Sequence, residues 1–105
     1  MLTPEIILNK IEENSETIKK HNVKRIGLFG SYVKNEQTAE SDIDLVVEFE
    51  KGKKTFDNYM ELKFFLEDLL ECKVDLVIAE AIKPDLKPYI MEDVKYPFET
   101  DVSKA

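Results

Sequence analysis

Asp42 and Asp44 flank a single isoleucine at the start of an alternating apolar run that ends at Phe49. Side chains alternate along a strand, so the two carboxylates project to one side while Ile43 projects to the other. Aspartate is depleted from strands, and a strand with one buried face needs an apolar side chain at every second position. On its own this pattern also fits solvated acids at the edge of a loop, so an active-site interpretation depends on Gly30-Ser31 and Asp75 as well.

A third aspartate occupies the same kind of position in a later run. The apolar residues of segment 74–78 alternate with Asp75, which places Asp75 on the face away from the core. If the two strands are neighbours, three carboxylates converge, and like charges repel. A divalent cation removes this repulsion. Mg²⁺ binds a few carboxylates together with water and substrate phosphates, and a pair of such ions suits phosphoryl or nucleotidyl transfer.

A Gly-Ser pair precedes the acids, at Gly30 and Ser31. Glycine lets a backbone approach a phosphate closely, and the N–H groups that open a helix can bind the phosphate. The Ser31 hydroxyl would add a contact. Neither GxxxxGK[ST] nor GxGxxG occurs in the chain, and Leu and Val follow Asp44 where an EF-hand loop has polar ligands. Gly30 and Ser31 are therefore the candidates for phosphate binding.

Three strands and three helices are expected around these residues. Thr3-Pro4-Glu5 is typical of a helix start, and Thr55 is a plausible N-cap for a second helix. The aromatic and leucine side chains of that second helix recur at helical spacing and are expected mainly in the core. In chain order we expect a helix over 4–20, strands over 23–29 and 43–49, a helix over 56–71, a strand over 74–78 and a helical segment over 86–94.

This order predicts an α+β domain, in which a small mixed β-sheet is flanked by helices and one polar face stays partly open. A chain of 105 residues suffices for one modest core. We expect a single domain over 1–98 and a flexible C-terminal tail over 99–105.

The charge balance argues against direct contact with nucleic acid. The chain has 22 acidic and 15 basic residues and a net charge of -7, whereas binding to a phosphate backbone depends on Lys and Arg. A nucleotide substrate is compatible with this charge if divalent cations lie between carboxylates and phosphates. No apolar run approaches a membrane span, and neither the N-terminus nor the lone Cys72 indicates export. We therefore expect a cytoplasmic protein without membrane contact.

The ordered combination of Gly30-Ser31, ten further residues, Asp42-Ile43-Asp44 and a later aspartate that opens a strand resembles the DNA polymerase beta superfamily of nucleotidyltransferases. Within it, the short chain is similar to the minimal nucleotidyltransferases, and the resemblance covers residues 20–95. The resemblance implies the nucleotidyltransferase fold. It also implies that Asp42 and Asp44 hold two Mg²⁺ ions and that Asp75 completes the site as ligand or base.

The same resemblance implies that Gly30 and Ser31 bind the triphosphate of ATP. Relatives commonly carry Arg-Gly-Glu where this chain has Lys34-Asn35-Glu36. Lys34 keeps the positive charge for a phosphate contact but lacks the bidentate fork of arginine.

The resemblance further implies a protein partner, because many minimal nucleotidyltransferases are antitoxins encoded beside a HEPN ribonuclease toxin. Several of them transfer AMP from ATP onto a tyrosine of the toxin and silence it. We therefore expect a Mg²⁺-dependent antitoxin that adenylylates a HEPN toxin. Two alternatives stay open: an antitoxin that neutralises its toxin by binding alone, and a nucleotidyltransferase that acts on a small molecule.

Overall fold

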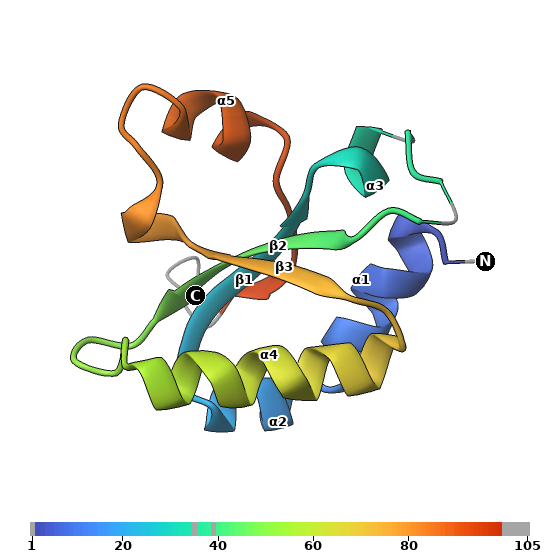
Figure 1. Ribbon diagram of the computed structural model, residues 1–105. Coiled ribbons are helices and arrows are strands. Elements are labelled where there is room, and N and C mark those ends of the chain that lie inside the picture. The colour runs from blue at the N-terminus through green and yellow to red at the C-terminus, as the bar shows by residue number, and fades with distance from the viewer. Residues whose placement is uncertain (1, 35, 39, 100–105) are drawn as a thin grey trace.

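The computed structural model describes residues 2–34, 36–38 and 40–99 (Figure 1). Its α-helices are α1 (Pro4–Glu13), α2 (Ser15–Lys20), α3 (Ser31–Lys34), α4 (Phe56–Leu70) and α5 (Lys87–Glu92), and a 3-10 helix, η1, covers Ala79–Ala81. Its strands are β1 (Val23–Phe29), β2 (Ile43–Phe49), β3 (Val74–Ile78) and β4 (Lys95–Glu99). A flexible tail was expected over 99–105. Glu99 belongs to β4, and residues 100–105 lie outside the described residues.

The four strands form one mixed sheet in the order β3-β2-β1-β4. β1 pairs antiparallel with both β2 and β4, whereas β2 and β3 run parallel and are connected through α4. Figure 1 shows α1, α2 and α4 on one side of the sheet, with α3 and α5 near its other side. The expected fold class, a small mixed sheet with flanking helices, is confirmed.

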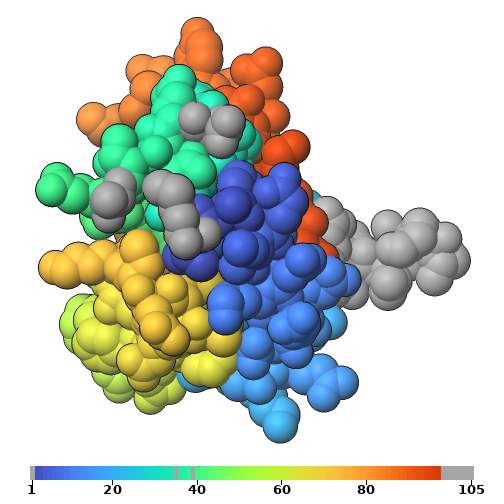
Figure 2. All heavy atoms as spheres, turned by 90° about the vertical axis from the view of Figure 1, so that its right-hand side faces the viewer, coloured from blue at the N-terminus to red at the C-terminus, as the bar shows by residue number. Residues whose placement is uncertain are grey.

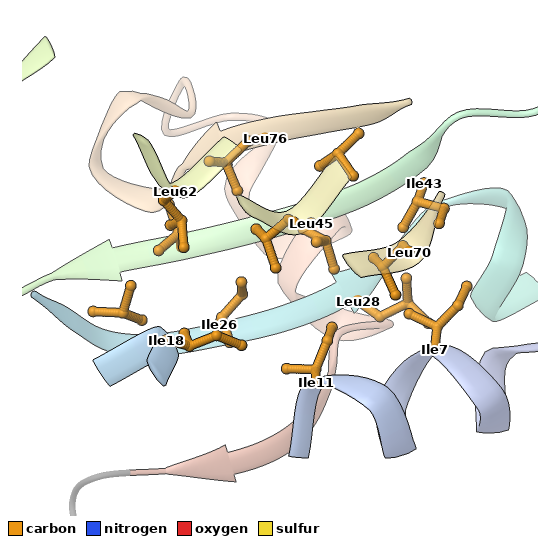
Figure 3. Packing of buried hydrophobic residues seen from close by; sticks show 14 of the residues in the cluster. Ile7, Ile11, Ile18, Ile26, Leu28, Ile43, Leu45, Leu62, Leu70 and Leu76 are labelled. Carbon is orange, nitrogen blue, oxygen red and sulfur yellow. The ribbon is translucent and has the colours of Figure 1, made fainter. Parts of the chain in front are cut away.

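The main core fills the space between the sheet and the helices α1, α2 and α4 (Figure 3). Alternate residues of β1 and β2 point into it, together with one face of each helix. Its fully buried side chains are Ile7, Ile11, Ile18, Val23, Ile26, Leu28, Ile43, Leu45, Val47, Leu62 and Leu66. Because this core takes one face of β2, the aspartates at alternate positions are directed to the other face.

The first helix is interrupted, where one helix over 4–20 was expected. Thr3 caps α1 through a bond from the Ile6 N–H at 3.2 Å, as its sequence predicted. The Asn14 side chain then donates to Lys10 O at 2.8 Å, and its backbone leaves helical geometry at φ -108° and ψ 21°. An asparagine amide competes with the helical hydrogen bonds in this way, so the chain turns between α1 and α2.

β4 was not predicted. It lies beside β1, where the side chains of Val94 and Tyr96 occupy the space above Gly27 that a Cβ would fill. Pro97 lies within this strand, although proline cannot donate a backbone hydrogen bond to a ladder. The chain tolerates it because β4 is at the edge of the sheet.

The second face of the sheet is less open than expected. Val46, Ala79 and Ile82 form a small buried cluster there, and Phe29, Val77, Ile90, Met91 and Val94 pack against it. This cluster lies under η1 and α5 and covers the middle of the face. The aspartates lie at one end of the face, next to this apolar cover.

Two aromatic residues of α4 depart from the expected core placement. Thr55 caps the helix, and the helix ends at Glu71, both as expected. The left-handed conformation of Glu71 was not predicted. Phe56 and Phe64, however, are 76% and 56% exposed.

No described helix is long and apolar enough to cross a membrane.

Candidate active site

The turn after β1 brings the chain against the Asp44 carboxylate. Gly30 has φ +81°, a left-handed conformation that side chains disfavour. A Cβ at Gly30 would overlap Oδ2 of Asp44. Two features therefore require glycine at position 30: its backbone angle, and the Asp44 carboxylate that occupies the space of a Cβ.

Ser31 begins α3, and its backbone N–H binds Asp44. This hydrogen bond acts to lower the pKa of the carboxyl. Because the N–H is used in this way, the hydroxyl is the group of Ser31 that could make the expected phosphate contact. The one-turn helix α3 lies beside the start of α1 (Figure 2). Val33 of α3 and Leu8 of α1 line the same pocket.

Asp44 and Asp75 face each other on neighbouring strands. The parallel ladder pairs them directly, with Leu45 opposite Leu76 as the next pair. Burial is the largest cause that raises the pKa of Asp44, followed by the charges of Asp75 and Asp42, and the result is a pKa of about 6. Of the three carboxylates expected to converge, Asp44 and Asp75 are thus paired directly, and burial together with the neighbouring charges disfavours the ionised form of Asp44.

Asp42 lies at the end of a structured turn just before β2. The Thr38 N–H donates to Ser41 Oγ at 2.8 Å, and the Ser41 N–H donates to Thr38 O at 3.1 Å. Cys72 Sγ lies 3.7 Å from Ser41 O, which ties the turn to the segment before β3. Asp42 is exposed at the rim and acts on Asp44 through charge.

The acids fit a divalent cation, although they do not form a complete ligand cage. Among the residues that the structure describes, no group of three or more acidic, Cys or His side chains stands ready to hold a metal. Mg²⁺ usually takes only one or two carboxylates and completes its shell with water and substrate phosphates. Asp44 and Asp75 face each other, with Asp42 at the rim, and together they offer the carboxylate oxygens and the concentrated negative charge that such an ion requires.

The remaining candidates are less closely tied to this pair. Lys34 is exposed at the last position of α3, and its neighbour Asn35 lies outside the described residues. Glu48 shares the face of the aspartates but pairs with Arg25 at 2.8 Å, which fits a structural role.

Two residues of α4, Tyr59 and Glu67, contact the backbone of β3 on either side of Asp75. Sequence reasoning missed these contacts, because helical spacing does not reveal which side chains reach a strand edge.

The chain belongs to the nucleotidyltransferase family, since the model of the nucleotidyltransferase domain matches residues 8–97. A relative from Methanocaldococcus jannaschii, which carries the name protein adenylyltransferase MJ0128, is 51% identical over 79 residues, or 74% of this chain and 80% of the relative. Protein adenylyltransferase MntA of Thermococcus cleftensis is 34% identical over 97 residues, or 91% of this chain and 97% of the relative. The resemblance to the minimal nucleotidyltransferases is therefore confirmed, and the chain is an enzyme by family.

Solved structures agree with this assignment. One described as a minimal nucleotidyltransferase is 30% identical, has a TM-score of 0.78 and covers 90% of this chain and 95% of that chain. A second, described as a toxin–antitoxin with AMP-PNP, is 26% identical, has a TM-score of 0.68 and covers 88% of this chain and 76% of that chain.

Proposed function

We propose that the protein is a Mg²⁺-dependent adenylyltransferase that moves AMP from ATP to a tyrosine hydroxyl of a HEPN toxin and thereby neutralises it. The observation that carries the proposal is the Asp44–Asp75 pair beside Gly30. The names of the relatives, protein adenylyltransferase and MntA, support the reaction. The neighbour that pairs a toxin–antitoxin with AMP-PNP supports both the partner class and the nucleotide.

Each residue has a role in this reaction. Asp42 and Asp44 hold Mg²⁺, and Gly30 lets the triphosphate lie close to the backbone, where Ser31 and Lys34 contact it. Bound Mg²⁺ supplies charge neutralisation for the triphosphate and for the leaving pyrophosphate. Two ions are expected from the resemblance to the family.

In the proposed reaction, Asp75 receives the proton of the acceptor. It is exposed on the edge strand, where a partner can reach it, whereas Asp44 is partly buried against Gly30. As the acceptor oxygen gives its proton to Asp75, it attacks the α-phosphorus of ATP. The bond between the α-phosphorus and the oxygen that bridges to the β-phosphorus breaks, and pyrophosphate leaves. The products are AMP-tyrosine and pyrophosphate.

Intact-mass spectrometry tests this proposal. The protein encoded by the neighbouring gene is incubated with this chain, ATP and Mg²⁺, beside an Asp42→Asn/Asp44→Asn control. We expect a gain of one or more AMP masses that the control lacks, and tryptic mapping to place them on tyrosine. An unchanged mass, with a stable complex between the two proteins, would instead indicate an antitoxin that acts by binding alone.

A further inference from the structure

Two backbone groups of β3 point away from the sheet on either side of Asp75. Among the described strands, β3 lies at the edge of the sheet and pairs with β2. The Ile43 N–H donates to Lys73 O at 3.0 Å, and in a parallel ladder the backbone groups of the next residue then point outward. The same alternation turns the N–H and C=O of Val74 and Leu76 outward, while Asp75 faces β2 with its backbone.

Side chains of α4 bind these outward groups. Glu67 Oε2 accepts the Val74 N–H at 3.0 Å. Tyr59 Oη donates to Leu76 O at 2.6 Å. Both hydrogen bonds are partly buried, and the two side chains are about two turns apart on the same side of the helix. An edge strand normally leaves such groups to solvent or to another strand.

We propose that Tyr59 and Glu67 are positioning residues, which clamp β3 from its outer edge so that Asp75 stays opposite Asp44. The proposal rests on the proposed function, because Asp75 acts there on the acceptor. A slip of one residue along β3 would turn Asp75 to the core face. Even a displacement of about 1 Å at a reacting group can lower a rate roughly a hundredfold.

The geometry explains why one edge needs support at this point. Among the described strands, only β2 pairs with the strand that carries Asp75, so the ladder holds Asp75 from one side. The hydrogen bonds of Val74 with Glu67 and of Leu76 with Tyr59 hold β3 from its other side, immediately before and immediately after Asp75.

Three variants test the clamp. Tyr59→Phe removes one hydroxyl, Glu67→Ala removes the acceptor, and Glu67→Gln keeps an oxygen that can accept the Val74 N–H. Tyr89→Phe and Asp68→Asn are matched controls, because both residues are exposed and neither belongs to the site. Each variant is measured for AMP transfer to the neighbouring-gene protein and for amide hydrogen exchange in β3, with the amides of β1 as an internal reference.

We expect Tyr59→Phe and Glu67→Ala each to lower kcat roughly three- to tenfold, in line with the loss of one hydrogen bond, while KM for ATP changes less than about twofold. Exchange in β3 should accelerate by a similar factor, with β1 unchanged. Glu67→Gln and both controls should match the parent. The split between kcat and KM separates a positioning effect from a general loss of stability.

The proposal would be overturned by unchanged kcat and β3 exchange in Tyr59→Phe and Glu67→Ala, by equal acceleration in β1 and β3, or by a Glu67→Gln variant as impaired as Glu67→Ala. A parent chain that transfers no AMP would refute the proposed function alone. In that case the exchange rates would still decide whether the two side chains hold β3.

Discussion

Asp44 on β2 lies directly opposite Asp75 on β3, and its carboxylate occupies the space that a Cβ at Gly30 would fill. Three elements distant in the chain therefore meet at one carboxyl group. Burial and the charges of Asp75 and Asp42 raise its pKa to about 6. The protein thus maintains an unfavourable concentration of negative charge, which is the expected signature of a site for a cation and a polyphosphate.

Asp44→Asn should raise the free energy of unfolding in metal-free buffer near neutral pH. The pKa of Asp44 is about 6 in the folded chain, against 3.8 for an unperturbed aspartate. As pH rises, Asp44 therefore keeps its proton to a higher pH in the folded state than in the unfolded state. The free energy of unfolding of the parent falls as pH rises from about 4 to about 6, and the full loss is present above that range. Because Asp44 is only partly buried, we expect a gain of about 1 kcal/mol once solvent screening is allowed for.

Urea unfolding of parent and Asp44→Asn at about pH 4 and pH 7.5 measures this difference. The gain should be present at the higher pH and largely absent at the lower one. An equal gain at both values would contradict a charge origin and point to packing.

Mg²⁺ with a non-hydrolysable ATP analogue should raise the Tm of the parent, because a ligand that binds only the folded state stabilises it. At a hundred times Kd the stabilisation is about 2.7 kcal/mol, which corresponds to a shift of roughly 11–22 °C for a domain of this size, at about 4–8 °C for each kcal/mol. Differential scanning fluorimetry measures the shift. The Asp42→Asn/Asp44→Asn variant should show little shift, and Mg²⁺ without nucleotide should give a smaller one in the parent. A full shift in the double variant would remove both aspartates from the proposed metal site.

Gly30→Ala should abolish transfer and destabilise the protein. The new Cβ would overlap Asp44, and the alanine backbone would have to adopt φ +81°. We expect a loss of about 1–3 kcal/mol in stability, the usual range for strained backbone, and a fall in AMP transfer of at least roughly a hundredfold because Asp44 must move.

Gly52→Ala is the matched control for Gly30→Ala. Gly52 has nearly the same backbone angle, φ +78°, but nothing lies within 4 Å of its Cβ position. It should show a comparable strain effect on chemical denaturation with transfer kept near the parent level. Equal activity loss in the two variants would mean that backbone strain, and not the contact with Asp44, explains the effect.

Leu66→Ala should destabilise the domain far more than Phe64→Ala. Leu66 is fully buried in the main core, whereas Phe64 is 56% exposed on the same helix. Truncation of a buried leucine typically lowers stability by about 2–5 kcal/mol, and a substitution at an exposed position by about 0.5 kcal/mol. Urea midpoints measure both. A large loss in Phe64→Ala would show that its ring packs more tightly than its exposure suggests.

Much of the fold followed from local patterns in the sequence. The alternation in 43–49 and 74–78 identified two strands and the face on which each aspartate lies, and Thr55 and Glu71 bounded α4. The parallel pairing of these strands was only a condition in that reasoning. It depends on the connection through α4, which no local pattern encodes.

The errors had two causes: a tertiary contact that outweighs local preference, and a local side-chain bond that interrupts a regular helical spacing. Pro97 disfavoured a strand, yet β4 forms because it pairs with β1 at the sheet edge. Asn14 divided a helix whose apolar spacing was continuous, because its side chain bonds the backbone of Lys10. The bonds from Tyr59 and Glu67 to β3 join residues that only the folded chain brings together.

The two faces of the sheet separate folding from chemistry. The main core lies on the face of α1, α2 and α4, and the aspartates lie on the other face, where their repulsion opposes folding. Substitutions that remove these acids therefore leave the core intact and can even raise the free energy of unfolding of the domain. Over evolutionary time, a lineage of this fold can drift from a catalyst to a stable protein that only binds its partner, with no unfolded intermediate along the way.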